Sequence, residues 1–134
     1  MDLVPNPVTG RLWVIRLSEE LGRRIHEITK DWPTSQKEHE GDQLIRATDS
    51  IGSNLSEGHA RVHIKDRLHF IYMAQGSLEE ALFYLRRARE RKLVSELESA
   101  MLSALLIKLA KAINNYAAYQ RRGEYGGEPI RRCT

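Results

Sequence analysis

Apolar residues recur at steps of three and four along most of this chain, a spacing that predicts amphipathic helices. Four stretches carry it: residues 12–30, 42–57, 64–92 and 95–120. None of them shows the sustained alternation of apolar and polar residues that a strand requires. In the third stretch the apolar period is about 3.5 residues, which favours the shallow helix crossings of a four-helix bundle.

Short polar segments separate the predicted helices. Pro33 closes the first helix, because proline disfavours helix at Trp32 and supplies no amide donor of its own. Residues 34–41 are then expected to form a polar connection, with Asp42 as the N-cap or a first-turn acid of the second helix and Gly58 as its stop. Because the connections are short, an antiparallel up-down-up-down order is favoured.

The chain length of 134 residues suits a single domain. We expect the bundle to span residues 12–120, after an N-terminal extension of residues 1–11 and before a flexible basic tail of residues 121–134. No signal peptide is apparent, and the most apolar run, 101–113, contains two lysines and is too short to span a bilayer. Cys133 is the single cysteine, so no intrachain disulfide can form. These features predict a cytoplasmic protein with no membrane partner.

The second predicted helix is unusual because small polar residues crowd its interior. They are Ser50, Gly52, Ser53, Asn54 and Ser56. The third helix carries a matching stripe of small residues: Ala74, Gly76, Ser77, Ala81 and Ala88. Two helices with small faces can approach closely, and the same stripes suit a contact between subunits. The serines have no paired base at a suitable offset, so we interpret both stripes as packing surfaces rather than catalytic groups.

These residues, at fixed offsets, carry a resemblance to a known family. In the second helix and the following turn they are Asp42, Gln43, Leu44, Arg46, Ala47, Ser50, Ile51, Ser53, Asn54, Glu57, Gly58 and Arg61. In the third helix they are Phe70, Ala74, Gly76, Ser77, Leu78 and Glu80. With Trp32-Pro33, they resemble the bacterial four helix bundle protein family, also called the 23S rRNA intervening-sequence protein family. The sequence departs at Gly52, where the family often has proline, and at His63, where it usually has a hydroxyl residue.

The resemblance implies a small helical bundle that assembles into a ring, notably a homopentamer. Some members are encoded inside intervening sequences of rRNA genes. A related branch is the accessory protein of diversity-generating retroelements, which binds nucleic acid and a reverse transcriptase. The motif has no known catalytic role, so its residues are carried over as structural or interface residues. They are Arg46, Ser50, Asn54, Glu57, Gly58, Arg61, Gly76 and Ser77.

Charge is unevenly distributed along the chain. The formal net charge is only +3, but residues 81–134 hold 11 Lys and Arg against 5 Asp and Glu. This asymmetry suggests a surface that faces a polyanion, and guanidinium groups suit phosphate oxygens. The candidate nucleic-acid-binding residues are Arg86, Arg87, Arg91, Lys92, Arg121 and Arg122. The alternative is a solvated helix end whose cations complement the helix dipole.

Other residues with potential chemistry give weaker patterns. His59, His63 and His69 lack the cysteines or the HExxH spacing of a metal site, so no metal and no cofactor is expected. Tyr72, Tyr84, Tyr116 and Tyr119 are expected in the core, at an interface or at a rim rather than as a base-stacking platform. Neither a phosphate-binding loop nor a nucleophile motif is present.

The sequence therefore predicts an all-α, non-enzymatic protein that forms a ring-like homo-oligomer. Its first expected role is that of an accessory protein that contacts RNA or DNA backbones. The alternative is a protein–protein adaptor or scaffold with no nucleic-acid role. A third reading is a passenger of a selfish element that has no host partner.

Overall fold

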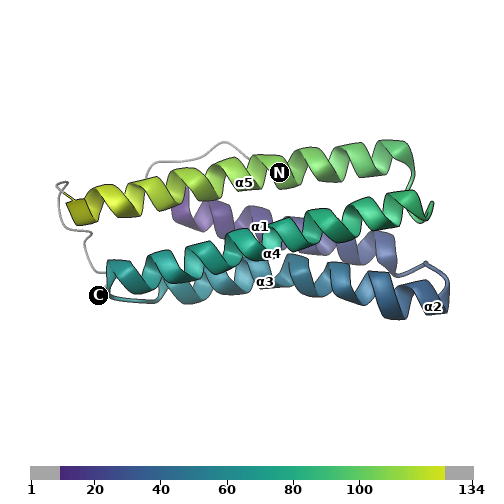
Figure 1. Ribbon diagram of the computed structural model, residues 1–134, viewed down its shortest axis with the longest axis horizontal. Coiled ribbons are helices and arrows are strands. Elements are labelled where there is room, and N and C mark those ends of the chain that lie inside the picture. Colours follow the sequence, from purple (N-terminus) through teal and green to yellow (C-terminus); the bar gives the residue numbers. More distant parts are fainter. Residues whose placement is uncertain (1–9, 126–134) are drawn as a thin grey trace.

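The computed structural model describes residues 10–125, and this part of the chain is helical with no strand. The elements in chain order are α1 (Gly10–Thr29), α2 (Thr34–Gln36), the π-helical turn η1 (Lys37–Gly41), α3 (Asp42–His59), α4 (Ile64–Glu90) and α5 (Glu96–Tyr125). Figure 1 shows the four long helices lying side by side along the long axis of the molecule. The prediction of an all-helical protein with four long helices is confirmed. Among residues 10–125, no helix is long and apolar enough to cross a membrane.

Each long helix packs against two others around one core. Helix α3 packs most extensively on α4 and also contacts α1, and α5 contacts both α4 and α1. The interior holds the apolar positions that the periodicity selected, among them Leu17, Leu21, Ile51, Leu78 and Leu109. Removing such a side chain from water stabilises the fold by roughly 1.5–3 kcal/mol, so these stripes account for the association of the helices.

The segment before α3 differs from the predicted polar connection. Residues 34–41 are helical, and Gly41 has helical dihedral angles (φ −61°, ψ −49°), so Asp42 is the first-turn acid of α3 and not its N-cap. The helical path begins directly after Pro33, whose ψ of 145° is extended and whose carbonyl accepts the Lys37 amide at 2.8 Å. Trp32 is buried nearby, with its ring 3.5 Å from the place where a Gly41 Cβ would lie. The turn therefore packs over the tryptophan, with Gly41 at ordinary contact distance from its ring.

The end of α3 also differs from the prediction, because Gly58 is not a stop. The helix continues to His59, and Gly58 is buried. A Cβ added at Gly58 would lie 2.8 Å from Phe70 Cβ and 3.3 Å from the Arg67 carbonyl oxygen, both on α4. The missing side chain therefore permits the close approach of two helices rather than ending one of them.

The ends of α4 and α5 follow recognisable capping rules. Lys92 has a positive φ of 61° just after α4, and the Leu93 amide donates to the Ala88 carbonyl at 2.8 Å, as in a Schellman motif. Ser95 and Glu98 then form a capping box before α5, with both hydrogen bonds at 3.0 Å. Helix α5 runs to Tyr125, so the first five residues of the predicted flexible tail are helical. The tail residues 126–134 and the N-terminal residues 1–9 lie outside the described part of the chain.

Candidate nucleic-acid interface

Two arginines of the predicted basic group are exposed on the last turns of α4. Arg86 is exposed and makes no hydrogen bond or ion pair with any residue in the described range 10–125. Arg87 is also exposed, and its Nη1 lies 3.4 Å from Glu90 Oε2, at the long end of an ion pair. Surface pairs of this kind contribute little, so both guanidinium groups can bind an anion at small cost.

Arg91 and Lys92, in contrast, have roles within the fold. Arg91 Nη1 donates to Glu40 Oε1 at 2.5 Å, and the Glu40 side chain is only 8% exposed. The pair joins the end of α4 to η1, and Arg91 supplies the counter-charge that a buried carboxylate needs. Lys92 occupies the left-handed position that ends α4. If Arg91 bound a phosphate, the Glu40 carboxylate would stay buried without its partner, and this would destabilise the fold.

Arg121 and Arg122 lie far from Arg86. Arg121 Nη1 donates to the hydroxyl of Tyr72 at 2.9 Å, and the Arg122 guanidinium carbon lies 5.9 Å from the centre of the Tyr119 ring. Tyr72 precedes Arg86 by 14 residues on α4. With a rise of 1.5 Å per residue, the two groups are separated by about 21 Å along the helix. The structure therefore divides the predicted basic residues between two places and does not bring them into one surface.

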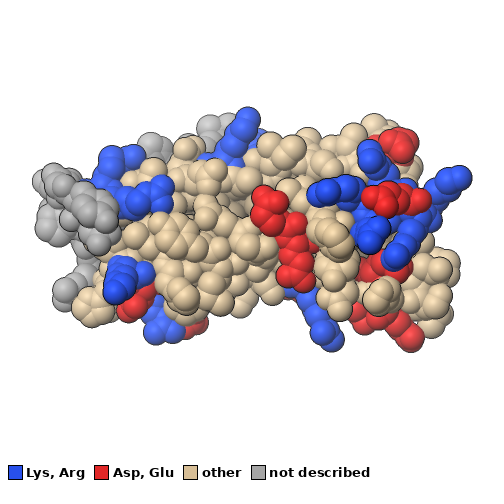
Figure 2. Space-filling model, viewed as in Figure 1, with Lys and Arg blue, Asp and Glu red and all other residues tan. Residues whose placement is uncertain are grey.

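Acidic residues limit the basic group on α4. Glu79 and Glu80 are both exposed and lie one helical turn before Phe83. Figure 2 shows Lys and Arg gathered toward the right-hand end of this face, interleaved with acids, while further acids occupy the middle of the face. An anion is therefore attracted to the end of α4 and repelled from the middle of the helix.

The motif residues at the α3–α4 turn do come together. Glu57 Oε1 accepts a hydrogen bond from Arg61 Nη2 at 2.5 Å. The same arginine stacks on Phe70, with its guanidinium carbon 4.9 Å from the ring centre. Since Phe70 also packs at Gly58, these four residues hold the start of α4 against the end of α3.

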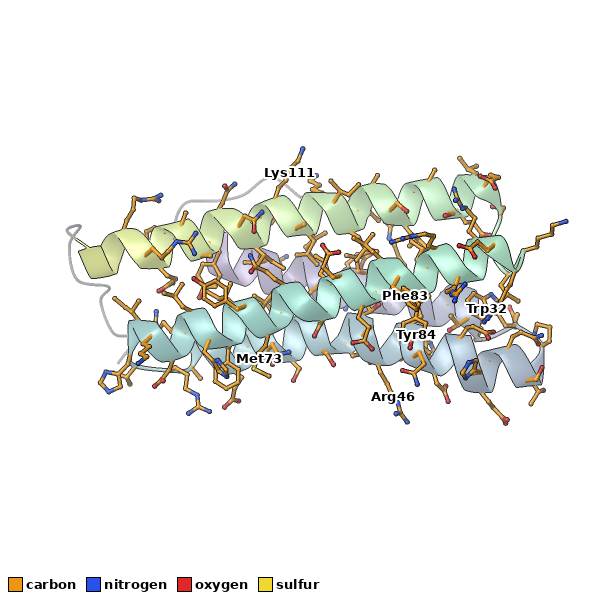
Figure 3. All side chains as sticks on the ribbon, viewed as in Figure 1. Trp32, Arg46, Met73, Phe83, Tyr84 and Lys111 are labelled. Atoms are coloured by element: carbon orange, nitrogen blue, oxygen red, sulfur yellow. The ribbon has the colours of Figure 1, made fainter. Side chains whose placement is uncertain are left out.

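The remaining motif residues lie toward the surface. Ser50 and Asn54 are half-buried on α3, and Arg46 is exposed and points away from the helices (Figure 3). Ser77 Oγ donates to the Met73 carbonyl of its own helix at 3.1 Å. A Cβ at Gly76 would meet nothing within 4 Å, so this glycine serves no contact within the described chain.

Several structurally important residues were missed by the sequence reasoning. Arg67 is only 2% exposed, and its Nε donates to the Arg61 carbonyl at 2.6 Å, inside the α3–α4 turn. Phe83, in contrast, is 45% exposed and lies beneath the guanidinium group of Arg87. The spacing of four residues between Phe83 and Arg87 is a helical neighbour pair, which is the sequence signal that could have indicated this contact.

Possible metal ligands and a surface groove are the remaining candidates for chemistry among the described residues. Between residues 10 and 125, no group of three or more His, Cys, Asp and Glu side chains is arranged to hold a metal ion. A shallow groove of about 560 Å³ runs between α1 and α3, lined by Glu19, Gly22, Arg23, His26, Glu27, Ile45 and Asp49. Close by, hydrogen bonds from Arg23 and then Arg24 hold the pKa of Glu20 below its usual range. These are charge pairs of an exposed surface, with no serine, threonine or cysteine nucleophile lining the groove.

Comparison with known proteins supports the resemblance seen in the sequence. A family model described as "23S rRNA-intervening sequence protein" matches residues 11–115. A similar solved structure is a protein of unknown function from the S23 ribosomal protein family of Bacteroides thetaiotaomicron, with 19% sequence identity and a TM-score of 0.76. That match covers 81% of this chain and 98% of the other, and at this identity it supports the fold alone. Among curated proteins, none matches the chain. Because the family model spans most of the four helices, the chain belongs to the 23S rRNA-intervening sequence protein family.

Proposed function

We propose that this protein is a non-enzymatic accessory protein that binds the phosphate backbone of RNA or DNA through Arg86 and Arg87. The carrying observation is that these two guanidinium groups are exposed at the end of α4, where the only ion pair that either makes with a described residue is the long one from Arg87 to Glu90. Guanidinium groups bind phosphate oxygens through paired hydrogen bonds. The contact is expected to follow charge and not base sequence.

The same proposal includes an antiparallel up-down-up-down topology and a ring-like homo-oligomer, with the pentamer as the expected size. Short connections between α3, α4 and α5, together with the pattern of neighbouring helices, support the topology. Exposed large apolar side chains on α4 and α5 support self-association, because water-exposed apolar surface favours burial in a contact. Those outside the basic end of α4 are Tyr72, Met73, Leu97, Met101, Ile107 and Tyr119. In a ring, each copy would present its own Arg86 and Arg87, and several weak contacts would act together.

The alternative function is a protein–protein adaptor or scaffold. The same apolar side chains on α4 and α5 favour it, because they suit another protein as well as a second copy. A reverse transcriptase is the partner that the retroelement branch of the family would offer. In that case the arginines of α4 would be a solvated helix end.

Binding across a salt series tests the nucleic-acid proposal. Structured RNA and duplex DNA are titrated with the wild type and with an Arg86→Ala/Arg87→Ala variant between roughly 50 and 200 mM salt. We expect the variant to bind more weakly and to lose about one to two units of the slope of log K against log salt. Arg16→Ala/Lys111→Ala is the matched control, because it removes two exposed cations from α1 and α5 and should change binding little.

Light scattering establishes that the variants keep the oligomeric state of the wild type. If the wild type fails to bind either nucleic acid at low salt, the proposal is wrong and the adaptor reading takes its place. Equal losses in the two double variants would also contradict it, since binding would then depend on total charge and not on the end of α4.

A further inference from the structure

Phe83 is an exposed aromatic ring inside the basic group of α4. It is 45% exposed, and the ring of Tyr84 meets it edge-on, with centroids 5.1 Å apart and planes at 89°. Figure 3 shows both residues on the stretch of α4 toward the Trp32 end of the molecule. Tyr84 is itself half-buried, so it holds one edge of the Phe83 ring in place.

The Arg87 guanidinium carbon lies 5.4 Å from the centre of the Phe83 ring, a cation–π distance. Arg86, the next residue along, is exposed and unpaired within the described range. One ring and two guanidinium groups therefore form a single surface, which we call the Phe83 surface: Phe83, Arg86 and Arg87.

This combination is what a single-stranded nucleic acid needs. Aromatic side chains stack on bases, and nearby arginines bind the adjoining phosphates. A base inside a duplex is already stacked on both faces, so only an unpaired base can reach an exposed protein ring. A duplex offers its phosphates to Arg86 and Arg87 but nothing to Phe83. Stacking on Phe83 therefore adds a preference for single strands over duplexes, which the charge of the arginines alone does not give.

The acids on the other side of the ring restrict the path of the strand. Glu79 and Glu80 are exposed one turn before Phe83 and would repel phosphates. The strand would then run from Phe83 toward the end of α4 and not back along the helix. The contact involves few nucleotides: one stacked base and the phosphates next to it.

We infer that the Phe83 surface binds single-stranded nucleic acid by stacking one unpaired base on Phe83 while Arg86 and Arg87 hold the adjacent phosphates. This inference rests on the proposed function, and it adds the strandedness of the ligand. It commits to a nucleic acid because the exposed residues that follow the ring toward the end of α4 include two cations, Arg86 and Arg87, and the Arg87 guanidinium group lies over the ring. A second copy of the chain packing on Phe83 is the competing occupant.

The test compares Phe83→Leu, which keeps an apolar side chain but removes the ring, with Phe83→Trp, which restores a larger ring. The probes are a single-stranded RNA containing one 2-aminopurine and a duplex of the same sequence. For Phe83→Leu we expect about a tenfold loss of affinity for the single strand, no change for the duplex, and an unchanged salt slope. The 2-aminopurine fluorescence should change when the wild type or Phe83→Trp binds, because the base leaves its neighbours to stack on the ring, and should change less when Phe83→Leu binds.

Two results would overturn the inference while the proposed function stands. One is unchanged single-strand affinity in Phe83→Leu when Arg86→Ala/Arg87→Ala still weakens binding, which would mean a contact to phosphate alone. The other is a change of oligomer mass in Phe83→Leu, which would mean that the ring is buried between copies. Failure of the wild type to bind any nucleic acid would instead remove the proposed function itself.

Discussion

Gly58 lies at a close contact between two helices, whereas Gly76 lies at an open surface. Replacing each glycine with alanine tests this difference. Both lie inside helices, so both replacements gain the higher helix propensity of alanine. Only Gly58 has a neighbour in the way: its Cβ would lie 2.8 Å from Phe70 Cβ and 3.3 Å from the Arg67 carbonyl oxygen. A Cβ at Gly76 would lie in open space.

The expected magnitudes follow from these distances. Phe70 Cβ and the Arg67 carbonyl belong to the backbone region of α4 and cannot rotate away, so α4 must shift. Overpacking of this kind costs about 1–3 kcal/mol, and the helix propensity of alanine offsets up to about 1 kcal/mol of it. We therefore expect Gly58→Ala to lower the free energy of unfolding by about 1–2 kcal/mol. Gly76→Ala should raise it by about 0.5–1 kcal/mol.

Thermal and urea unfolding at one fixed protein concentration measure the difference, because the stability of an oligomer depends on concentration. For a chain of this size, 1 kcal/mol corresponds to about 4 °C, so the two variants should differ in Tm by roughly 6–12 °C. Equal stability of the two variants would refute the steric argument at Gly58. A loss of stability in Gly76→Ala, together with a lower oligomer mass, would show that Gly76 meets another copy.

Three further outcomes follow from the surface of α4. Arg91→Ala should lower the free energy of unfolding in urea by about 1–3 kcal/mol, because Glu40 stays buried without its cation; adding Glu40→Gln should recover part of that loss. Glu79→Gln/Glu80→Gln should tighten RNA binding several-fold at low salt and have little effect at high salt. Unchanged binding at low salt would contradict the repulsion of phosphates by these two acids. Tyr72→Phe should change the free energy of unfolding by less than about 0.5 kcal/mol, since its hydrogen bond to the arginine of α5 is exposed; calorimetry measures this.

The helices themselves could be predicted because burial is periodic on each of them. The segment 34–41 could not, since a proline followed by polar residues suits a loop and also a helix that starts at Pro33. What decides between them is the burial of Trp32 against Gly41, a contact that no local pattern reveals. Gly58 was misinterpreted for a related reason: a helix stop and a close helix contact both require the absence of a Cβ, and the sequence does not distinguish them.

The candidate site was only partly predictable, because charge is visible in a sequence and pairing is not. The partner of Arg91 is Glu40, 51 residues earlier, and the partner of Arg121 is Tyr72, 49 residues earlier. Such pairings depend on which helices become neighbours and at what level. The sequence therefore predicted the basic composition of the site, but it could not separate the arginines that stabilise the fold from those available to a ligand.

The two arginine groups lie about 21 Å apart along the helix, so the molecule has two chemically different ends. One end presents Arg86 and Arg87 with an exposed phenylalanine, and the level of Tyr72 presents Arg121 bonded to a tyrosine hydroxyl. Copies that assemble side by side in the same orientation would produce two chemically different rims. Such a particle has polarity: a nucleic acid would approach one rim, and the opposite rim would stay available for a partner of another kind.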